Sequence, residues 1–207
     1  MSFMGKIICL MGKSGAGKDT LYKHLMSDER LALRSIVSYT TRPIRAGEQD
    51  GVEYHFTDEA GYLRLQAEGR IIEARSYETV HGRWRYFTVA DDQLDLDMAD
   101  YCMIGTLEAY VSLRDYFGPG QVIPVLMELD DGERLYRALA RERAQEQPKY
   151  EEMCRRFLAD SQDFAEERIR NAGIDRRFYN NDLERCREEI RAYIEQEIRR
   201  GKYGYQS

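Results

Sequence analysis

Short apolar runs alternate along the chain with longer segments in which apolar residues recur every three or four positions. The runs predict buried strands, because a strand that is covered on both faces carries few polar side chains. Four such strands are predicted, at residues 6–11, 34–39, 101–106 and 121–129. The last one contains Pro124, which lacks an amide hydrogen and therefore argues against a central place in a sheet.

The amphipathic segments between these runs predict helices. Residues 57–68 begin with Thr57 and Asp58, whose side chains suit a helix N-cap. Residues 107–117 lead directly into Gly118, a residue type that ends helices. The other predicted helices comprise residues 19–27, 131–145, 149–171 and 182–200. Strands that alternate with helices in this way indicate an α/β fold, with a parallel sheet flanked by helices.

Residues 40–90 break this alternation with a mixture of Thr, Tyr, Val, His and charged residues, which predicts a small mixed insert. The chain contains no internal repeat and no linker rich in Gly or Ser. We therefore expect a single domain over residues 1–207. Its predicted parts are a core of residues 1–36, 95–130 and 165–200, the insert of residues 37–94, and a helical lid of residues 131–164.

The charge balance limits the possible partners. The chain has 31 Lys and Arg residues against 37 Asp and Glu residues, a formal net charge of −6. A chain without a net positive field is not a general binder of nucleic acids or anionic membranes, so we expect neither partner. Any anion must be bound by a local site.

The expected location is the cytoplasm. The first apolar run is too short for a signal peptide or a membrane span. The four cysteines are far apart and form no C-x-x-C pair, so we expect free thiols that fill the core in a reducing compartment.

A glycine-rich loop carries the strongest chemical signal. It directly follows the first predicted strand, directly precedes a predicted helix, and reads Gly12-Lys13-Ser14-Gly15-Ala16-Gly17-Lys18. In such a G-x-x-x-x-G-K loop, glycines let main-chain N–H groups converge on a phosphate while the lysine reaches the β- and γ-phosphates. The positive end of the following helix favours the same anion. We predict that all seven residues bind ATP; a glycine-rich turn without a ligand is the alternative.

The loop departs from the usual pattern at one position. The residue after Lys18, which is usually Ser or Thr, is Asp19, and a hydroxyl follows only at Thr20. Asp19 is a candidate Mg²⁺ ligand through its carboxylate oxygen, and capping of the helix is an equally good interpretation. We include Asp19 and Thr20 among the predicted ATP contacts.

A second motif begins about twenty residues after the loop. It consists of Ser38, Thr40, Thr41, Arg42, Arg45, Gly47, Glu48, Asp50, Gly51, Glu53, Tyr54 and Phe56. Two arginines three apart near hydroxyl groups suit the bidentate recognition of a phosphate. In this density and spacing the segment resembles the guanylate kinase family. The resemblance implies that Arg42, Arg45 and Tyr54 bind the phosphate of a nucleoside monophosphate, with Arg42 also catalytic, and that Ser38 helps to bind the base.

The resemblance extends to the rest of the predicted insert. The segment from Gly69 to Ala74 is similar to the family's G-x-F-I-E-x-A motif, which implies that Glu73 accepts hydrogen bonds from guanine. The family's Y-Y-G-T/S motif falls on residues 85–88. This implies that Tyr86 and Thr88 contact the substrate, although the first tyrosine and the glycine of the motif are absent.

Beyond the insert, the resemblance implies a closing lid. Arg137 and Arg141 lie four apart on one predicted helical face and resemble the family's lid arginines, which are catalytic. Arg156 resembles a later arginine that contacts the substrate phosphate. Asn180 falls in a segment similar to the family's V-N-D-D-L turn near the adenine of ATP.

One motif of the family is missing. Its D-I-D-x-Q-G strand end falls on Gly105 and the residues after it, so that both aspartates are absent and Leu107 occupies the second position. An aliphatic side chain can neither orient a water molecule on Mg²⁺ nor accept a hydrogen bond from an N–H group. Glu108 is adjacent, but we expect it to point in another direction at a helix start.

The resemblance therefore implies a P-loop kinase that transfers a phosphoryl group from MgATP to GMP, with ATP and Mg²⁺ as cosubstrates. We expect a monomer or a homodimer. Two alternatives stay open. The missing acids favour a kinase of another nucleotide or a small phosphorylated acceptor. A non-catalytic interaction module of the same fold is the other alternative, although such modules have a degraded P-loop and this loop keeps Gly12, Gly17 and Lys18.

Overall fold

The computed structural model describes residues 4–45, 47–79 and 82–203. Within these residues, the central sheet has five strands, which pair in the order β2-β7-β1-β8-β9, and every pair is parallel. The strands are β1 (Ile7–Gly12), β2 (Arg34–Ser35), β7 (Tyr101–Ile104), β8 (Val122–Glu128) and β9 (Arg177–Tyr179). This confirms the predicted α/β fold with a parallel sheet.

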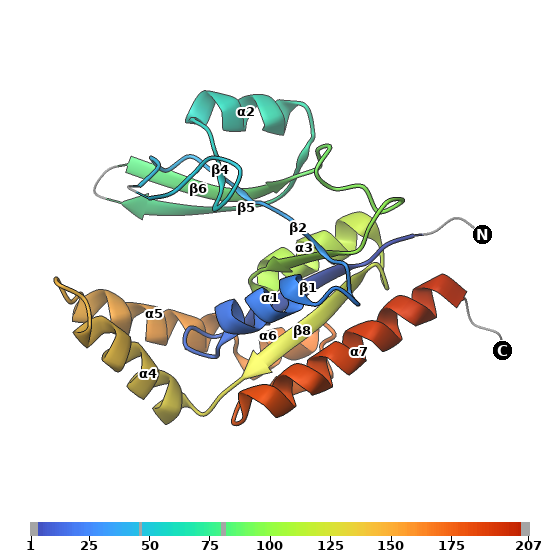
Figure 1. The fold of residues 1–207 in the computed structure, drawn as a ribbon. Helices are drawn as coiled ribbons and strands as arrows, with labels where there is room; N and C mark the ends of the chain where they lie inside the picture. The colour runs from blue at the N-terminus through green and yellow to red at the C-terminus, as the bar shows by residue number, and fades with distance from the viewer. Residues whose placement is uncertain (1–3, 46, 80–81, 204–207) are drawn as a thin grey trace.

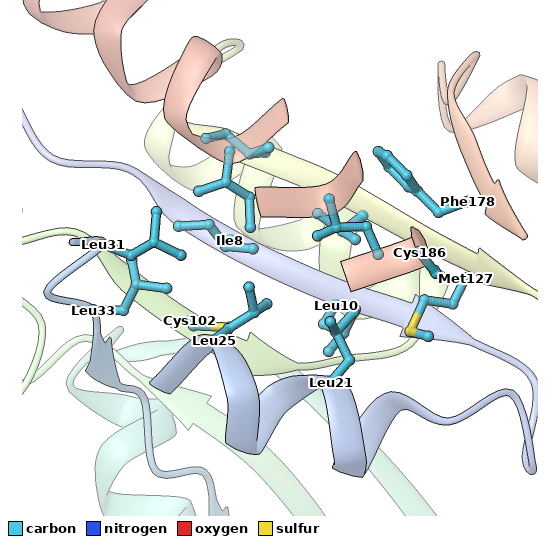
Figure 2. Close-up of a cluster of buried hydrophobic side chains, with 14 of the residues drawn as sticks. Ile8, Leu10, Leu21, Leu25, Leu31, Leu33, Cys102, Met127, Phe178 and Cys186 are labelled. Atoms are coloured by element: carbon cyan, nitrogen blue, oxygen red, sulfur yellow. The ribbon is translucent and has the colours of Figure 1, made fainter. Parts of the chain in front are cut away.

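All side chains of β1 are buried, because helices cover both faces of the central sheet. Ile8 and Leu10 pack in the cluster that includes residues of α1 (Lys18–Ser27) and α7 (Leu183–Tyr203). Figure 2 shows this cluster, in which Leu21 of α1 and Cys186 of α7 pack on the same face of the sheet. Ile7, Cys9 and Met11 pack in a second cluster with α3 (Leu107–Phe117) and α6 (Glu166–Asn171).

The insert forms a separate small sheet with one helix beside it (Figure 1). The strands pair in the order β4-β3-β6-β5, of which β3 and β4 are parallel and the other pairs antiparallel. The elements are β3 (Tyr39–Thr40), β4 (His55–Phe56), α2 (Glu59–Ala67), β5 (Ile71–Thr79) and β6 (Gly82–Val89). Tyr62 and Leu65 of α2 pack with Phe87 and Val89 of β6 in a small core of their own. The predicted mixed insert is thereby confirmed.

Two helices, α4 (Asp131–Arg143) and α5 (Tyr150–Asp163), lie beyond the end of β8 and pack against each other (Figure 1). None of the residues of α5, all of which the structure describes, is fully buried. These two helices correspond to the predicted lid. The boundaries of core, insert and lid as separate units stay a prediction.

Two predicted elements are each divided in the structure. Residues 34–39 form β2 in the central sheet and the start of β3 in the small sheet, because the chain passes from the core into the insert at this point. Residues 149–171 form α5 and α6, with a break at Phe164 and Ala165. The break lets Phe164 enter the core, whereas α5 stays on the surface.

Several local predictions have a clear outcome. Asp58 caps α2 by accepting a hydrogen bond from the N–H of Gly61 at 2.7 Å, as predicted. Pro124 lies within β8, next to the central strand, which corrects the expectation for that residue. It is tolerated because β9 pairs with β8 only from Leu126 onward.

The cysteines differ in burial. Three of them fill the core as expected, but Cys154 is exposed on α5, a helix in which no residue is fully buried. No helix in the described ranges combines the length and the apolar character that a membrane-spanning segment needs.

We expect Leu113→Ala to lower the free energy of unfolding by about 2–5 kcal/mol. Leu113 is fully buried between α3 and the sheet, so truncation leaves a cavity. The matched control is Leu158→Ala on α5, where the residue is 65% exposed, and we expect a change within about 0.5 kcal/mol. Urea unfolding of both variants measures the difference. Equal effects would contradict the burial pattern described above.

Candidate active site

The glycine loop connects β1 to α1 and has the backbone conformation that its sequence predicts. Gly15 and Gly17 have φ angles of 83° and 96°, a region that favours glycine. A Cβ atom on Gly17 would also clash with the side-chain amide of Asn180. The loop lies at the carboxyl end of the central strand β1. The helices that follow β1 and its neighbour β7, which are α1 and α3, lie on opposite faces of the sheet. In parallel sheets, ligands bind at such a position.

Lys18 is the first residue of α1, and its side chain turns back over the loop. Its Nζ donates hydrogen bonds to the carbonyl oxygens of Gly12 at 2.7 Å and Lys13 at 3.1 Å. Burial lowers the pKa of Lys18, because a charged ammonium loses solvation; nearby Asp160 and Asp19 act in the opposite direction. A buried ammonium of this kind is stabilised by a negative charge close to it.

The opposite side of the loop is supported by Asn180. This residue is 3% exposed, and its Nδ2 donates a hydrogen bond to the carbonyl oxygen of Ala16 at 2.8 Å. Its main-chain N–H donates to Glu128 at the end of β8. Asn180 therefore fixes the loop relative to the sheet, a role that the sequence analysis did not anticipate.

The two residues after Lys18 are exposed in the first turn of α1. The N-cap of α1 is Gly17, and no side-chain hydrogen bond from the described residues caps it. This excludes Asp19 as the cap of α1. Its carboxylate lies at the positive end of the helix, where it interacts favourably with the helix dipole. Within the described ranges, no group of three or more His, Cys, Asp or Glu side chains is arranged to hold a metal ion.

The lid contacts the loop through residues that the sequence analysis missed. Asp160 of α5 accepts a hydrogen bond from the main-chain N–H of Ser14 at 2.6 Å. Arg134 of α4, which is 1% exposed, donates from Nε to the carbonyl oxygen of Ser14 at 2.9 Å and from Nη2 to Asp160 at 3.1 Å. Asp131 accepts from Arg134 and forms an ion pair with Lys13. The sequence contains one signal that could have identified Arg134: this arginine lies one turn before Ala138, on the buried face of an amphipathic helix.

The lid arginines expected to bind phosphate lie on the exposed parts of the two helices. Arg137 is half-exposed and paired with Glu133 of the same helix at 2.7 Å. Arg141 is exposed, but it is close enough to Lys18 to lower the pKa of that residue. Arg156 is exposed on α5 and is paired with Glu152 at 2.8 Å.

The acceptor motif folds into a loop around a buried arginine. Arg42 is 3% exposed and donates two hydrogen bonds to the carboxylate of Glu48, at 2.7 and 2.6 Å. Its guanidinium also lies over the rings of Tyr54 and Phe56, at 5.1 and 5.3 Å from their centroids. The hydrogen bonds from Arg42 lower the pKa of Glu48 to about 2. The arginine is thus held in place by a partner that the sequence analysis did not identify.

The other residues of the motif surround Arg42. Arg45 is exposed, and its main-chain N–H donates to Glu48 at 2.8 Å. Tyr54 packs edge-on against Tyr86 of β6, so these two predicted substrate contacts lie together. Ser38 precedes β3, and its carbonyl oxygen accepts a hydrogen bond from the N–H of His55.

The predicted base-reading residues meet across β5 and β6. Glu73 is 6% exposed and accepts a hydrogen bond from the hydroxyl of Thr88 at 2.9 Å. Its second oxygen forms an ion pair with Nε of Arg75 at 3.4 Å. Burial raises the pKa of Glu73, and Arg75 and Thr88 oppose that effect. The Nε of Arg75 is buried without a hydrogen-bond partner among the described residues.

At the start of α3, where the family has two aspartates, this chain has other residues with other contacts. Leu107 begins α3 and packs in the core, and Glu108 is exposed and pairs with Arg168 of α6 at 2.6 Å. A cleft of about 280 Å³ lies between β5, the start of α3 and the junction of α5 and α6, with Arg75, Glu108 and Arg168 among its lining residues. The chemistry of this cleft therefore combines acids with arginines.

The sheet order and the glycine loop place this chain in the class of P-loop α/β proteins. The sequence profile of the guanylate kinase family matches residues 4–97. A guanylate kinase of Nitratidesulfovibrio vulgaris is 33% identical over 198 residues, which cover 94% of this chain and 88% of that protein. The chain belongs to the guanylate kinase family.

Other similar proteins agree with this assignment. A guanylate kinase of Chlorobaculum tepidum is 36% identical over 138 residues, which cover 65% of this chain and 67% of that protein. A guanylate kinase of Schizosaccharomyces pombe is 44% identical over 68 residues, a third of either chain. The crystal structure of a guanylate kinase from Anaplasma phagocytophilum has the same fold, with a TM-score of 0.63 over 95% of this chain and 87% of the other, at 20% identity.

The Arg42–Glu48 pair makes stability depend on pH. The pKa of Glu48 is about 2 in the folded protein and 4.5 ordinarily, so the stabilisation is complete above pH 4.5 and is lost as the pH falls toward 2. We expect Glu48→Gln to be less stable than the wild type at about pH 7, and the deficit to shrink below about pH 4.5. Urea unfolding at several pH values measures it. A deficit that is constant down to about pH 3 would contradict this account.

Proposed function

We propose that this protein is a nucleoside monophosphate kinase that transfers the γ-phosphoryl group of MgATP to GMP, giving ADP and GDP. The observation that carries the proposal is the half-buried Lys18 within a glycine loop whose Ser14 N–H already binds a carboxylate oxygen. Such a loop has the donors and the charge that a polyphosphate needs. Membership of the guanylate kinase family supports ATP and Mg²⁺ as cosubstrates and GMP as acceptor.

On the donor side, Lys18 and the N–H groups of residues 12–18 hold the β- and γ-phosphates. Thr20 in the first turn of α1 adds a hydroxyl, and Asn180 keeps the loop in place while its segment contacts the adenine. Asp19 is the proposed magnesium ligand of this chain. With one carboxylate available, Mg²⁺ takes its remaining ligands from phosphate oxygens and water, as is usual for this ion.

On the acceptor side, Arg42, Arg45 and Tyr54 hold the phosphate of GMP in line with the donor, and Tyr86 supports Tyr54. Arg42 has to share its guanidinium between Glu48 and the incoming phosphate, or to exchange one for the other. Arg156 on the lid contributes a further positive charge.

The base is bound by Ser38, Glu73 and Thr88. A carboxylate next to a hydroxyl suits the donor pair on the edge of guanine. Because Glu73 is buried, a base without these donors would lose affinity relative to guanine. Transfer itself needs positioning and charge neutralisation rather than a covalent intermediate. Arg137 and Arg141 supply positive charge when the lid closes, and closure excludes water as a competing acceptor.

A specific observation favours a second candidate, a kinase of another nucleotide or a small phosphorylated acceptor. Glu73, which would receive the guanine donors, already has Arg75 as an ion-pair partner. The cleft next to it presents Arg75 and Arg168, together with Glu108 and Asp163, with which Arg168 forms ion pairs. An acceptor with an additional acidic group fits these arginines better than guanine does. The intact glycine loop counts against a non-catalytic module. A cytoplasmic location and a monomer or homodimer stay predictions.

We expect Lys18→Ala to lower kcat by about 10²–10³-fold, because the ammonium neutralises charge that develops in the transition state. The fold should be retained, since the hydrogen bonds that the Lys18 ammonium donates within the described part of the chain go to loop carbonyls. Lys23→Ala, on the exposed face of the same helix, is the matched control. Initial rates of ADP release from MgATP and GMP measure both variants. Unchanged turnover in Lys18→Ala would refute the donor site.

The acceptor is tested with a panel of nucleoside monophosphates and small sugar phosphates, by ADP release from MgATP. We expect turnover with GMP, and we expect Glu73→Gln to raise the KM for GMP by about 10–100-fold with a smaller change in kcat. Glu68→Gln, at an exposed position after α2, is the control. Turnover with another acceptor but not with GMP would favour the second candidate, and activity with none would favour the module.

A further inference from the structure

The carboxylate of Asp160 occupies a position in the glycine loop that is built for an anion. Its Oδ2 accepts hydrogen bonds from the main-chain N–H of Ser14 and from Nη2 of Arg134. It is also the acidic group that acts most strongly on the pKa of Lys18. An amide and a guanidinium that donate to one oxygen atom, with an ammonium close enough to interact electrostatically with the same carboxylate, form the kind of donor set that proteins use for phosphate.

Arg134 is held in this position by contacts that do not involve Asp160. Its Nε donates to the carbonyl oxygen of Ser14 at 2.9 Å, and its Nη1 donates to Asp131. Its guanidinium also lies over the ring of Phe157, at 4.9 Å from the centroid. If Asp160 moves away, these contacts keep Arg134 beside the loop, with Nη2 available to another acceptor.

We propose that Asp160 competes with a donor phosphate for the same hydrogen-bond donors, and that Arg134 is a phosphate-binding residue of the donor site. When nucleotide binds, a phosphate oxygen displaces the Asp160 carboxylate and accepts the hydrogen bonds from Ser14 and Arg134. The inference rests on the proposed function, in which ATP is the donor. The inference adds Arg134 to the predicted lid arginines, and Arg134 is already in contact with the loop.

The competition has a measurable effect on affinity. A ligand that binds only after Asp160 has left the loop has its apparent affinity reduced by the fraction of molecules in which the loop is accessible. If Asp160 occupies the loop in about nine molecules of ten, removal of its charge strengthens phosphate binding about tenfold.

The first experiment measures binding of tripolyphosphate to the full chain by calorimetry. We expect Asp160→Asn to bind it about tenfold more tightly than the wild type. Asp131→Asn is the matched control: it removes the same charge from another partner of Arg134 but has no contact with the Ser14 amide. For this control we expect a change of about twofold. A gain in Asp160→Asn no larger than in Asp131→Asn overturns the competition.

The second experiment separates the two possible roles of Arg134. If Arg134 binds phosphate, Arg134→Gln weakens tripolyphosphate binding in the wild-type background and in the Asp160→Asn background alike. If it only holds Asp160, the weakening disappears in the double variant, and that result overturns its assignment as a phosphate-binding residue. Thermal unfolding checks the fold. Should Arg134→Gln not fold, Arg134→Lys replaces it, because it keeps the charge but loses the forked donors.

The outcomes distinguish this inference from the proposed function. Tighter tripolyphosphate binding by Asp160→Asn without phosphoryl transfer to any acceptor refutes the kinase and leaves the inference standing. Transfer from MgATP to GMP with no gain in Asp160→Asn refutes the inference and leaves the kinase standing. If neither the wild type nor Asp160→Asn binds tripolyphosphate, the inference is wrong.

Discussion

The glycine loop concentrates positive potential at one point, and neighbouring residues supply the negative charge and the hydrogen-bond acceptors that balance it. The Ser14 amide, the start of α1, which no side chain of the described residues caps, and the half-buried Lys18 all favour an anion in the same place. Lys18 satisfies part of its hydrogen bonding with loop carbonyls, and Asp160 supplies negative charge from the lid. The lid is therefore attached to the loop through the Ser14 N–H, the same hydrogen-bond donor that would bind a phosphate under the proposed function.

The proposed acceptor side differs electrostatically from the glycine loop, because three of its charged groups already have partners of opposite charge. Arg42 is paired with Glu48, Glu73 with Arg75, and Glu108 with Arg168. An acceptor that binds here has to exchange partners with these groups rather than fill a site of one sign. Such exchange gives specificity, since an acceptor that replaces only some of the contacts leaves a buried charge unpaired. Under the proposed function, Arg75 and Glu73 are the residues on which the identity of the acceptor depends most directly.

The family likeness is distributed unevenly along the chain. The matched profile covers residues 4–97, which contain the glycine loop and the small sheet, and it ends before the lid. Arg134 and Asp160, which join the lid to the loop, lie outside that region. The family profile alone therefore does not account for the contacts between the lid and the loop.

The sequence by itself determined the features that depend on local physics. The glycine loop, the strands beside it, the Asp58 cap and the stop at Gly118 follow from neighbouring residues, and the structure has them where the pattern predicts. Only the tertiary structure decided which charges meet. Asp160 reaches Ser14 across 146 residues, and no periodicity encodes that contact. Packing also divided residues 149–171 into two helices, because Phe164 gains more by entering the core than by continuing a surface helix.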